Sequence, residues 1–146
     1  MSACTFFGHR DCPESVKPAL REVLIDLIEN RDVDTFYVGR QGAFDAIVLS
    51  LLRELARAYP HINYAVVLES YDRRDDNLHY SETILPEGIG SVHPRFAIDR
   101  RNEWMLKQAD FVVTYVLWSW GGAAKFADKA MRQNKTVINT APSMVP

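Results

Sequence analysis

The feature of this sequence that most constrains its fold is a set of short apolar runs that alternate with segments of helical periodicity. Ala65-Val66-Val67-Leu68 is apolar at successive positions, whereas a strand with one face in water alternates apolar and polar residues. Such a run is typical of a strand that is covered on both faces of a parallel sheet. Similar β-prone runs predict five strands, at residues 4–7, 35–38, 62–68, 111–116 and 136–139.

Between these runs, apolar residues recur at helical spacing. Leu20, Leu24 and Leu27 belong to one such stripe, and Ile47, Leu51 and Leu55 belong to another. Residues 98–108 and 123–133 predict two further helices. Strands that alternate with helices predict an α/β fold, namely a Rossmann-like, doubly wound, mostly parallel sheet of five strands with helices on both faces.

The length of 146 residues fits one domain. No repeat or linker divides the sequence, so we expect a single domain over residues 1–146. Residues 70–95 interrupt the alternation, because they combine the mixed-charge run at 72–76 with turn residues at 86–90. They predict a long irregular insertion.

Charge and cysteine content limit the classes of partner. Seventeen Lys and Arg against nineteen Asp and Glu give a net charge of −2, which provides no drive towards nucleic acid or an anionic membrane. Cys4 and Cys12 have neither redox-pair nor zinc spacing, and His61, His79 and His93 are scattered. The longest apolar run is too short to span a bilayer, and the N-terminus lacks signal-peptide features. We therefore expect a cytoplasmic protein with no membrane contact, no metal and no resident cofactor.

Four turns that follow predicted strands are candidates for a ligand site, since ligands of such sheets bind at the carboxyl ends of the strands. They comprise residues 8–11, 39–45, 69–70 and 118–123. Two are glycine loops that lead into helices, whose first N–H groups bind phosphate or carboxylate. Neither loop has the GxGxxG or GxxxxGK pattern, so nothing supports hydride transfer or ATP hydrolysis. The loops favour a nucleotide-like anion, or else they are only tight turns.

Several single residues in these turns have two possible roles, one in ligand binding and one in structure. Arg10 offers bidentate phosphate contacts or a surface salt bridge. His9 is a phosphate donor or general acid, or a capping residue. Asp45 contacts a ribose hydroxyl or complements the start of its helix. Trp118 and Trp120 are candidates for stacking on a base.

Two carboxylates are candidates for catalysis at an N-glycosidic bond. Glu69 follows an apolar strand directly, and its alternative role is a loop salt bridge. Asp128 lies within a predicted helix, where its alternative is exposure to solvent. Trp104 and Met105 share a helical face that fits the core or a dimer interface.

The motifs Thr5–Arg10, Val38–Asp45, Arg101–Met105 with Ala109-Asp110, and Gly121–Ala123 resemble the bacterial and phage DUF1273-type branch of the SLOG superfamily. This superfamily also includes the LOG phosphoribohydrolases, which are lysine-decarboxylase-like, and the DNA-processing protein A fold. The resemblance covers nearly the whole chain and is weakest over residues 70–95. It implies a Rossmann-like fold, a nucleotide or nucleotide-derived ligand and, often, a homodimer.

The resemblance also bears on single positions. Active LOG enzymes carry a PGGxGTxxE stretch, whose glycines and Thr hold phosphate and whose Glu takes part in bond cleavage. Aligned on Gly121-Gly122, this chain has Trp120 in place of the Pro, Ala124 in place of the third Gly, Lys125 in place of the Thr and Asp128 in place of the Glu. Arg100 or Arg101 matches the family's basic position that contacts phosphate.

We therefore expect a protein that binds a nucleotide or nucleotide-derived ligand. The alternatives are an N-glycosidic-bond hydrolase or transferase, like a nucleoside 5′-monophosphate phosphoribohydrolase or a deoxyribosyltransferase, and a DNA-binding protein, against which the near-neutral charge argues. Arg10, Arg40, Arg100 and Arg101 are predicted to gather around one ligand. The candidate binding residues are Gly8, His9, Arg10, Gly39, Gln41, Gly42, Asp45, Arg100, Arg101, Ser119, Gly121 and Gly122.

Overall fold

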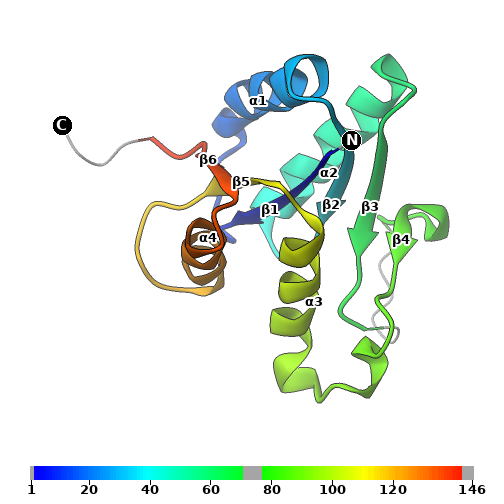
Figure 1. Cartoon of the computed structure of the whole chain (residues 1–146), viewed down its shortest axis with the longest axis vertical. Coiled ribbons are helices and arrows are strands. Elements are labelled where there is room, and N and C mark those ends of the chain that lie inside the picture. The colour runs from blue at the N-terminus through cyan, green and yellow to red at the C-terminus, as the bar shows by residue number, and fades with distance from the viewer. Residues whose placement is uncertain (1, 71–76, 143–146) are drawn as a thin grey trace.

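In a computed structural model, which describes residues 2–70 and 77–142, six strands form one parallel sheet in the spatial order β4-β3-β2-β1-β5-β6 (Figure 1). Every pair of neighbouring strands is parallel. The strands are β1 (Ser2–Gly8), β2 (Val33–Val38), β3 (Asn63–Val67), β4 (Thr83–Ile84), β5 (Phe111–Tyr115) and β6 (Thr136–Asn139).

The strand order reverses at β1. From there the chain adds β2, β3 and β4 on one side, and β5 and β6 on the other. The predicted α/β class is confirmed, but the predicted count of five strands is wrong, because β4 pairs with the end of β3 at the sheet edge. A strand of two residues is too short to show periodicity in a sequence. The sequence therefore did not predict β4, which lies within residues 70–95, the segment expected to be irregular.

Helices cover both faces of the sheet (Figure 1). One layer contains α1 (Lys17–Asn30) and α2 (Ala43–Ala58), and the other contains α3 (Pro94–Gln108) and α4 (Gly122–Arg132). Three short 3₁₀ helices complete the described segments: η1 (Glu14–Val16), η2 (Tyr80–Glu82) and η3 (Ile89–Ser91). Helix α3 begins one turn earlier than predicted, because Pro94 fits a first helical position and the His93 side chain accepts a hydrogen bond from the Arg95 N–H. No helix in these segments combines the length and hydrophobicity needed to cross a membrane.

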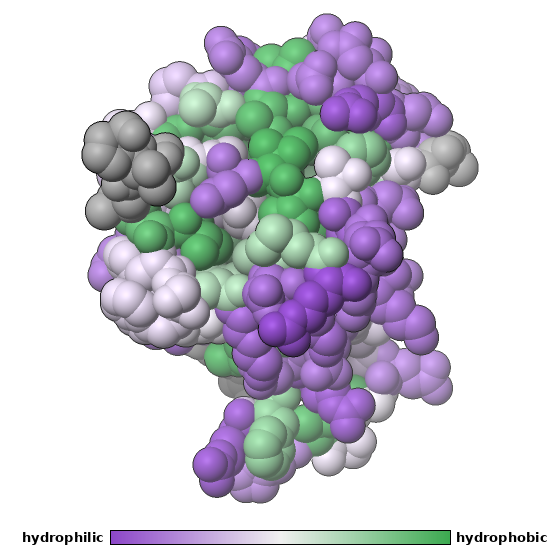
Figure 2. Space-filling model, turned by 60° about the vertical axis from the view of Figure 1, so that its left-hand side comes forward, coloured by the Kyte–Doolittle hydropathy of each residue, from purple (hydrophilic) through white to green (hydrophobic). Residues whose placement is uncertain are grey.

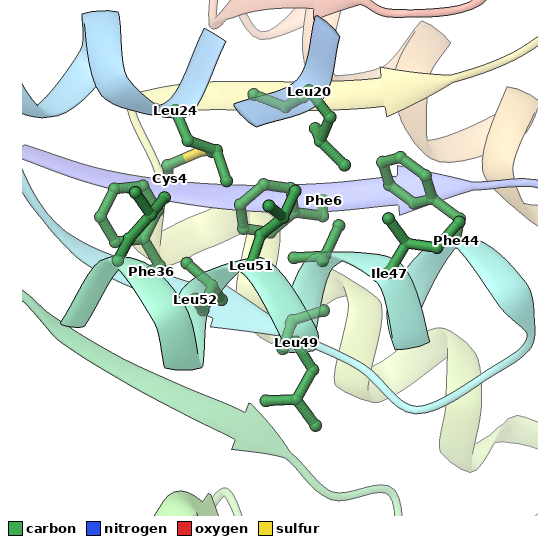
Figure 3. Packing of buried hydrophobic residues seen from close by; sticks show 14 of the residues in the cluster. Cys4, Phe6, Leu20, Leu24, Phe36, Phe44, Ile47, Leu49, Leu51 and Leu52 are labelled. Atoms are coloured by element: carbon green, nitrogen blue, oxygen red, sulfur yellow. The ribbon is translucent and has the colours of Figure 1, made fainter. Parts of the chain in front are cut away.

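Neighbouring residues of β1 pack against opposite layers. Phe6 is buried among side chains of α1 and α2 (Figure 3), and its ring stacks on Phe36 at 6.3 Å between centroids. Phe7 belongs to the core on the other face, where it stacks on Phe126 of α4 at 5.3 Å. Met105 is buried in this second core, and Trp104 packs against it. Burial on both faces explains why the strands are apolar at successive positions.

The second half of the predicted insertion is held by a buried carboxylate. Glu82 accepts hydrogen bonds from Arg53 at 2.8 Å and from the Tyr64 hydroxyl at 2.7 Å. These donors, with Arg53 first, lower the pKa of Glu82 to about 2. The mixed-charge run at 72–76 lies outside the described residues.

Candidate functional site

A pocket of about 380 Å³ lies at the carboxyl end of β1, beside the reversal of strand order. Its walls come from residues 8–11, from Gln41, from Ile98 of α3 and from the loop that joins β5 to α4. This loop lies at the left of Figure 1, on the side of the molecule that comes forward in Figure 2. The pocket has the size of a small-molecule site and the position expected for this sheet.

Aromatic rings form one wall of the pocket. Trp118 stacks on His9 with 4.0 Å between ring centroids, and on Trp120 with 5.4 Å between centroids. Trp120 is 68% exposed and lines the pocket. A flat, accessible indole of this kind can stack on a planar ring.

His9 ties the turn after β1 to the loop after β5. Its Nε2 accepts a hydrogen bond of 2.9 Å from the Leu117 N–H, so the proton of the neutral ring is on Nδ1. Burial lowers the pKa of the imidazole below its usual value. His9 therefore supplies the site with a neutral ring and one donor.

The start of α4 forms a second wall. Gly121 precedes the helix with φ of 93°, and no side chain caps the first turn. A Cβ atom built at Gly121 or Gly122 would meet none of the described residues within 4 Å. Gly122 and Ala123 line the pocket, so the N–H groups of this turn and the positive end of the helix dipole are available to an anion.

Arg10 and Gln41, both predicted binding residues, also line the pocket. Arg10 is exposed, and its Nη2 lies 3.5 Å from Gln41 Oε1. Gln41 Nε2 is buried and has no hydrogen-bond partner among the residues that the structure describes. A buried amide donor without a partner is unusual, and a ligand oxygen would satisfy it.

The glycine loop before α2 is closed by the chain itself. Gly42 has φ of 97°, and a Cβ atom there would lie 2.7 Å from the Cα of Arg10. The Ala43 N–H donates to the Arg10 carbonyl at 2.9 Å, and the Gln41 N–H donates to the Asp45 carboxylate at 2.8 Å. These contacts occupy donors that an anion would otherwise use.

Behind this loop lies a buried group of charges, which we call the ion-pair cluster: Arg40, Asp45, Glu69 and Arg101. Arg40 donates to Glu69 through Nε and Nη2, each at 3.0 Å. Arg101, which is 1% exposed, donates to the Val67 carbonyl at 3.1 Å and lies 3.5 Å from Glu69. Glu69 is thus engaged by two guanidinium groups and does not line the pocket.

Arg101 and Asp45 influence each other inside this cluster. Burial raises the pKa of Asp45 to about 6, although the Gln41 N–H and the charge of Arg101 both act to lower it. Burial likewise lowers the pKa of Arg101, against the charges of Asp45 and Glu69. The guanidinium packs on Gly39, where a Cβ atom would lie 2.9 Å from Cζ. The absence of a side chain at Gly39 therefore accommodates the Arg101 guanidinium rather than a ligand.

The structure brings only part of the predicted site together. Six of the predicted binding residues line the pocket: Gly8, His9, Arg10, Gln41, Gly121 and Gly122. Gly39 and Gly42 lie in the glycine loop before α2, Asp45 and Arg101 belong to the ion-pair cluster, and none of these four lines the pocket. Ser119 is exposed in the same loop as Trp120 but is outside the lining.

The predicted gathering of four arginines does not occur. Arg10 lines the pocket, whereas Arg40 and Arg101 are held in the ion-pair cluster, because buried guanidinium groups require carboxylate partners. Arg100 lines a different pocket, next to Lys107. Asp128 is exposed on α4 and pairs with Arg132 at 2.9 Å.

Three pocket residues, Asp11, Ile98 and Ala123, were not singled out from the sequence. Asp11 lines the pocket beside Arg10, and its place in the first turn was the available signal. Ile98 is a single exposed apolar residue on α3, which by itself indicates nothing. Within residues 2–70 and 77–142, no group of three or more His, Cys, Asp or Glu side chains could hold a metal ion.

No protein-family model matches this chain, and no curated protein matches it. Membership of the SLOG superfamily stays a prediction, and the function is inferred from the geometry of the pocket.

Proposed function

We propose that the pocket binds a nucleotide or a nucleotide-derived anion, with a phosphate at the N-terminus of α4 and a base on the face of Trp120. The observation that carries this proposal is that the uncapped helix start and the exposed indole line one pocket. A nucleotide combines the two chemistries that these walls recognise, an anion and a planar ring.

Side chains around the helix start supply further donors. Arg10 brings a guanidinium, which matches phosphate oxygens in a bidentate way. Gln41 Nε2 is a donor that already lacks a partner within the described segments. Together they provide a positive, donor-rich side, while Ile98 and Trp120 provide an apolar one.

We propose binding rather than turnover. Glu69 is held by Arg40 and Arg101, and Asp128 pairs with Arg132 on the surface, so neither candidate carboxylate is placed against the pocket. The order of the parallel strands is compatible with the SLOG resemblance, which implies a nucleotide-like ligand and often a homodimer, and both belong to the same proposal. The net charge of −2 disfavours the DNA-binding alternative.

Isothermal titration calorimetry with adenosine 5′-monophosphate and ADP-ribose tests the proposal. We expect measurable binding, and about tenfold weaker binding for Trp120→Ala, since stacking on a base is worth about 1–3 kcal/mol. Arg10→Ala should weaken binding by a similar factor because it removes a charge-assisted contact.

Arg21→Ala is the matched control, since Arg21 is exposed on α1 and pairs with Glu54 at the surface. Failure of both nucleotides to bind, or unchanged affinity in both pocket variants, would overturn the proposal. Incubation with nucleoside 5′-monophosphates followed by chromatography for free base tests turnover. Release of base would favour the N-glycosidic alternative instead.

A further inference from the structure

Gln41 is held in place by Asp45, which does not itself line the pocket. Its backbone N–H donates to the Asp45 carboxylate at 2.8 Å, and its side-chain Oε1 lies 3.5 Å from Arg10 Nη2. The Nε2 atom is the buried donor that lacks a partner among the described residues. The backbone bond to Asp45 is the shorter of these two contacts, so Asp45 has the larger part in placing Gln41 at the pocket.

Asp45 lies among charges from three other elements. Arg101 comes from α3, Glu69 follows β3 and Arg40 follows β2. The charge of Arg101 acts on Asp45 directly. Two arginines and two carboxylates make the cluster formally neutral, so protonation of Asp45 leaves an unbalanced positive charge in a buried place.

A carboxylate at this position is unfavourable for folding. Asp45 is 9% exposed, and burial of its charge is the main influence on its pKa, which is raised to about 6. A neutral side chain of the same shape would avoid this cost, but it would leave the charge of Arg101 less well balanced. Strongly perturbed ionisable groups cluster at functional sites, and structural ion-pair networks perturb pKa values as well.

We propose that Asp45 is a positioning residue that fixes the backbone of Gln41, so that the affinity of the pocket for a phosphate ligand follows the charge on Asp45. This inference rests on the proposed function. A charged acceptor holds an N–H roughly twice as strongly as a neutral one. Loss of the charge therefore loosens Gln41 and weakens the donor side of the pocket, while the stacking wall stays in place.

The test compares the wild type with Asp45→Asn, which keeps the shape and an acceptor oxygen but has no charge. Affinity for adenosine 5′-monophosphate is measured at pH 8 and at pH 5. We expect the variant to bind about tenfold more weakly at pH 8, and the two proteins to bind equally at pH 5, where Asp45 is protonated in the wild type. The ligand's own phosphate titrates with a pKa of about 6, and it affects both proteins alike. Asp26→Asn, an exposed aspartate on α1, is the control.

A second readout needs no ligand. Hydrogen exchange of the Gln41 amide, followed by NMR at pH 8, should be faster in Asp45→Asn than in the wild type, while core amides are unchanged. Equal affinities at pH 8, or a ratio that is the same at pH 8 and pH 5, would overturn the inference. If the wild type binds no nucleotide at either pH, the proposed function fails. The exchange of the Gln41 amide then decides the positioning role, and equal rates in the two proteins reject it.

Discussion

The two glycine loops of this protein share a backbone conformation and differ in what surrounds them. Gly42 before α2 has φ of 97° and ψ of −170°, and Gly121 before α4 has φ of 93° and ψ of 172°. Neither helix has a side-chain cap. At Gly42 a Cβ atom would meet Arg10, whereas at Gly121 it would meet no residue of the described segments within 4 Å. The same local signal therefore serves close packing in one loop and an open surface in the other.

The loop with more arginines nearby is not the loop that we expect to bind an anion. The closed loop is backed by the ion-pair cluster, whose guanidinium groups are already paired with carboxylates. The open loop contributes no arginine and offers backbone N–H groups beside Trp120. An anion is thus expected at the loop with fewer charged side chains, because no side chain within residues 2–70 and 77–142 caps its first N–H groups.

The largest expected effect is a difference in unfolding free energy between alanine substitutions in the two loops. Ala at either glycine must adopt a conformation that is nearly restricted to Gly, at a cost of about 1–3 kcal/mol. Gly42→Ala also pushes a methyl group against the Arg10 backbone, which adds about 1–3 kcal/mol. Urea denaturation should therefore show a greater loss of unfolding free energy for Gly42→Ala than for Gly121→Ala. Equal losses would mean that the loops do not differ in packing.

Sequence patterns predicted the elements of the fold better than the partners of its charges. The strand at residues 63–67 and the helix at 43–58 were visible because hydrophobic periodicity is a local property. The burial of Arg101 was not visible, since its partners Val67 and Glu69 are 34 and 32 residues away in the sequence. Nothing in the local sequence around Arg101 distinguishes it from its exposed neighbour Arg100. Only the folded chain decides which arginine faces a carboxylate.

A second, smaller effect on the unfolding free energy comes from the buried carboxylate of Asp45, behind the closed loop. Asp45 has a pKa raised from 3.8 to about 6, so between these values the native state holds a proton that the unfolded state has released. Wild-type stability therefore falls as pH rises through this window, and the penalty is complete above pH 6. Asp45→Asn should not show this fall, so its unfolding free energy should rise relative to that of the wild type by about 2–3 kcal/mol between pH 4 and pH 7, since one pKa unit corresponds to about 1.4 kcal/mol.

The difference between Asp45→Asn and the wild type should shrink towards zero near pH 4. Thermal or urea unfolding at pH 4, 5.5 and 7 measures it. Asp26→Asn, in an exposed position on α1, should show no such trend. A variant that is less stable than the wild type at pH 7 would show that the contacts of the Asp45 carboxylate, including its bond to the Gln41 N–H, outweigh the cost of burying its charge.

The smallest expected effect on stability concerns the open loop. Gly122 has no positive φ, and a Cβ atom there meets nothing within 4 Å. Gly122→Ala should therefore change the unfolding free energy by no more than about 0.5 kcal/mol. The added methyl group stands at the helix start that lines the pocket. It should weaken binding of adenosine 5′-monophosphate about tenfold, because it separates the phosphate from the N–H groups of α4.

Gly90→Ala is the matched control for Gly122→Ala, since Gly90 also has no positive φ and no neighbour within 4 Å, but lies outside the pocket lining. Calorimetry on both variants separates a change in the binding surface from a general effect of adding a methyl group. If neither variant binds more weakly, the phosphate does not sit at α4, and the two glycine loops differ only in how the chain packs around them. If Gly122→Ala alone loses affinity at unchanged stability, the open loop is where the glycines serve a ligand.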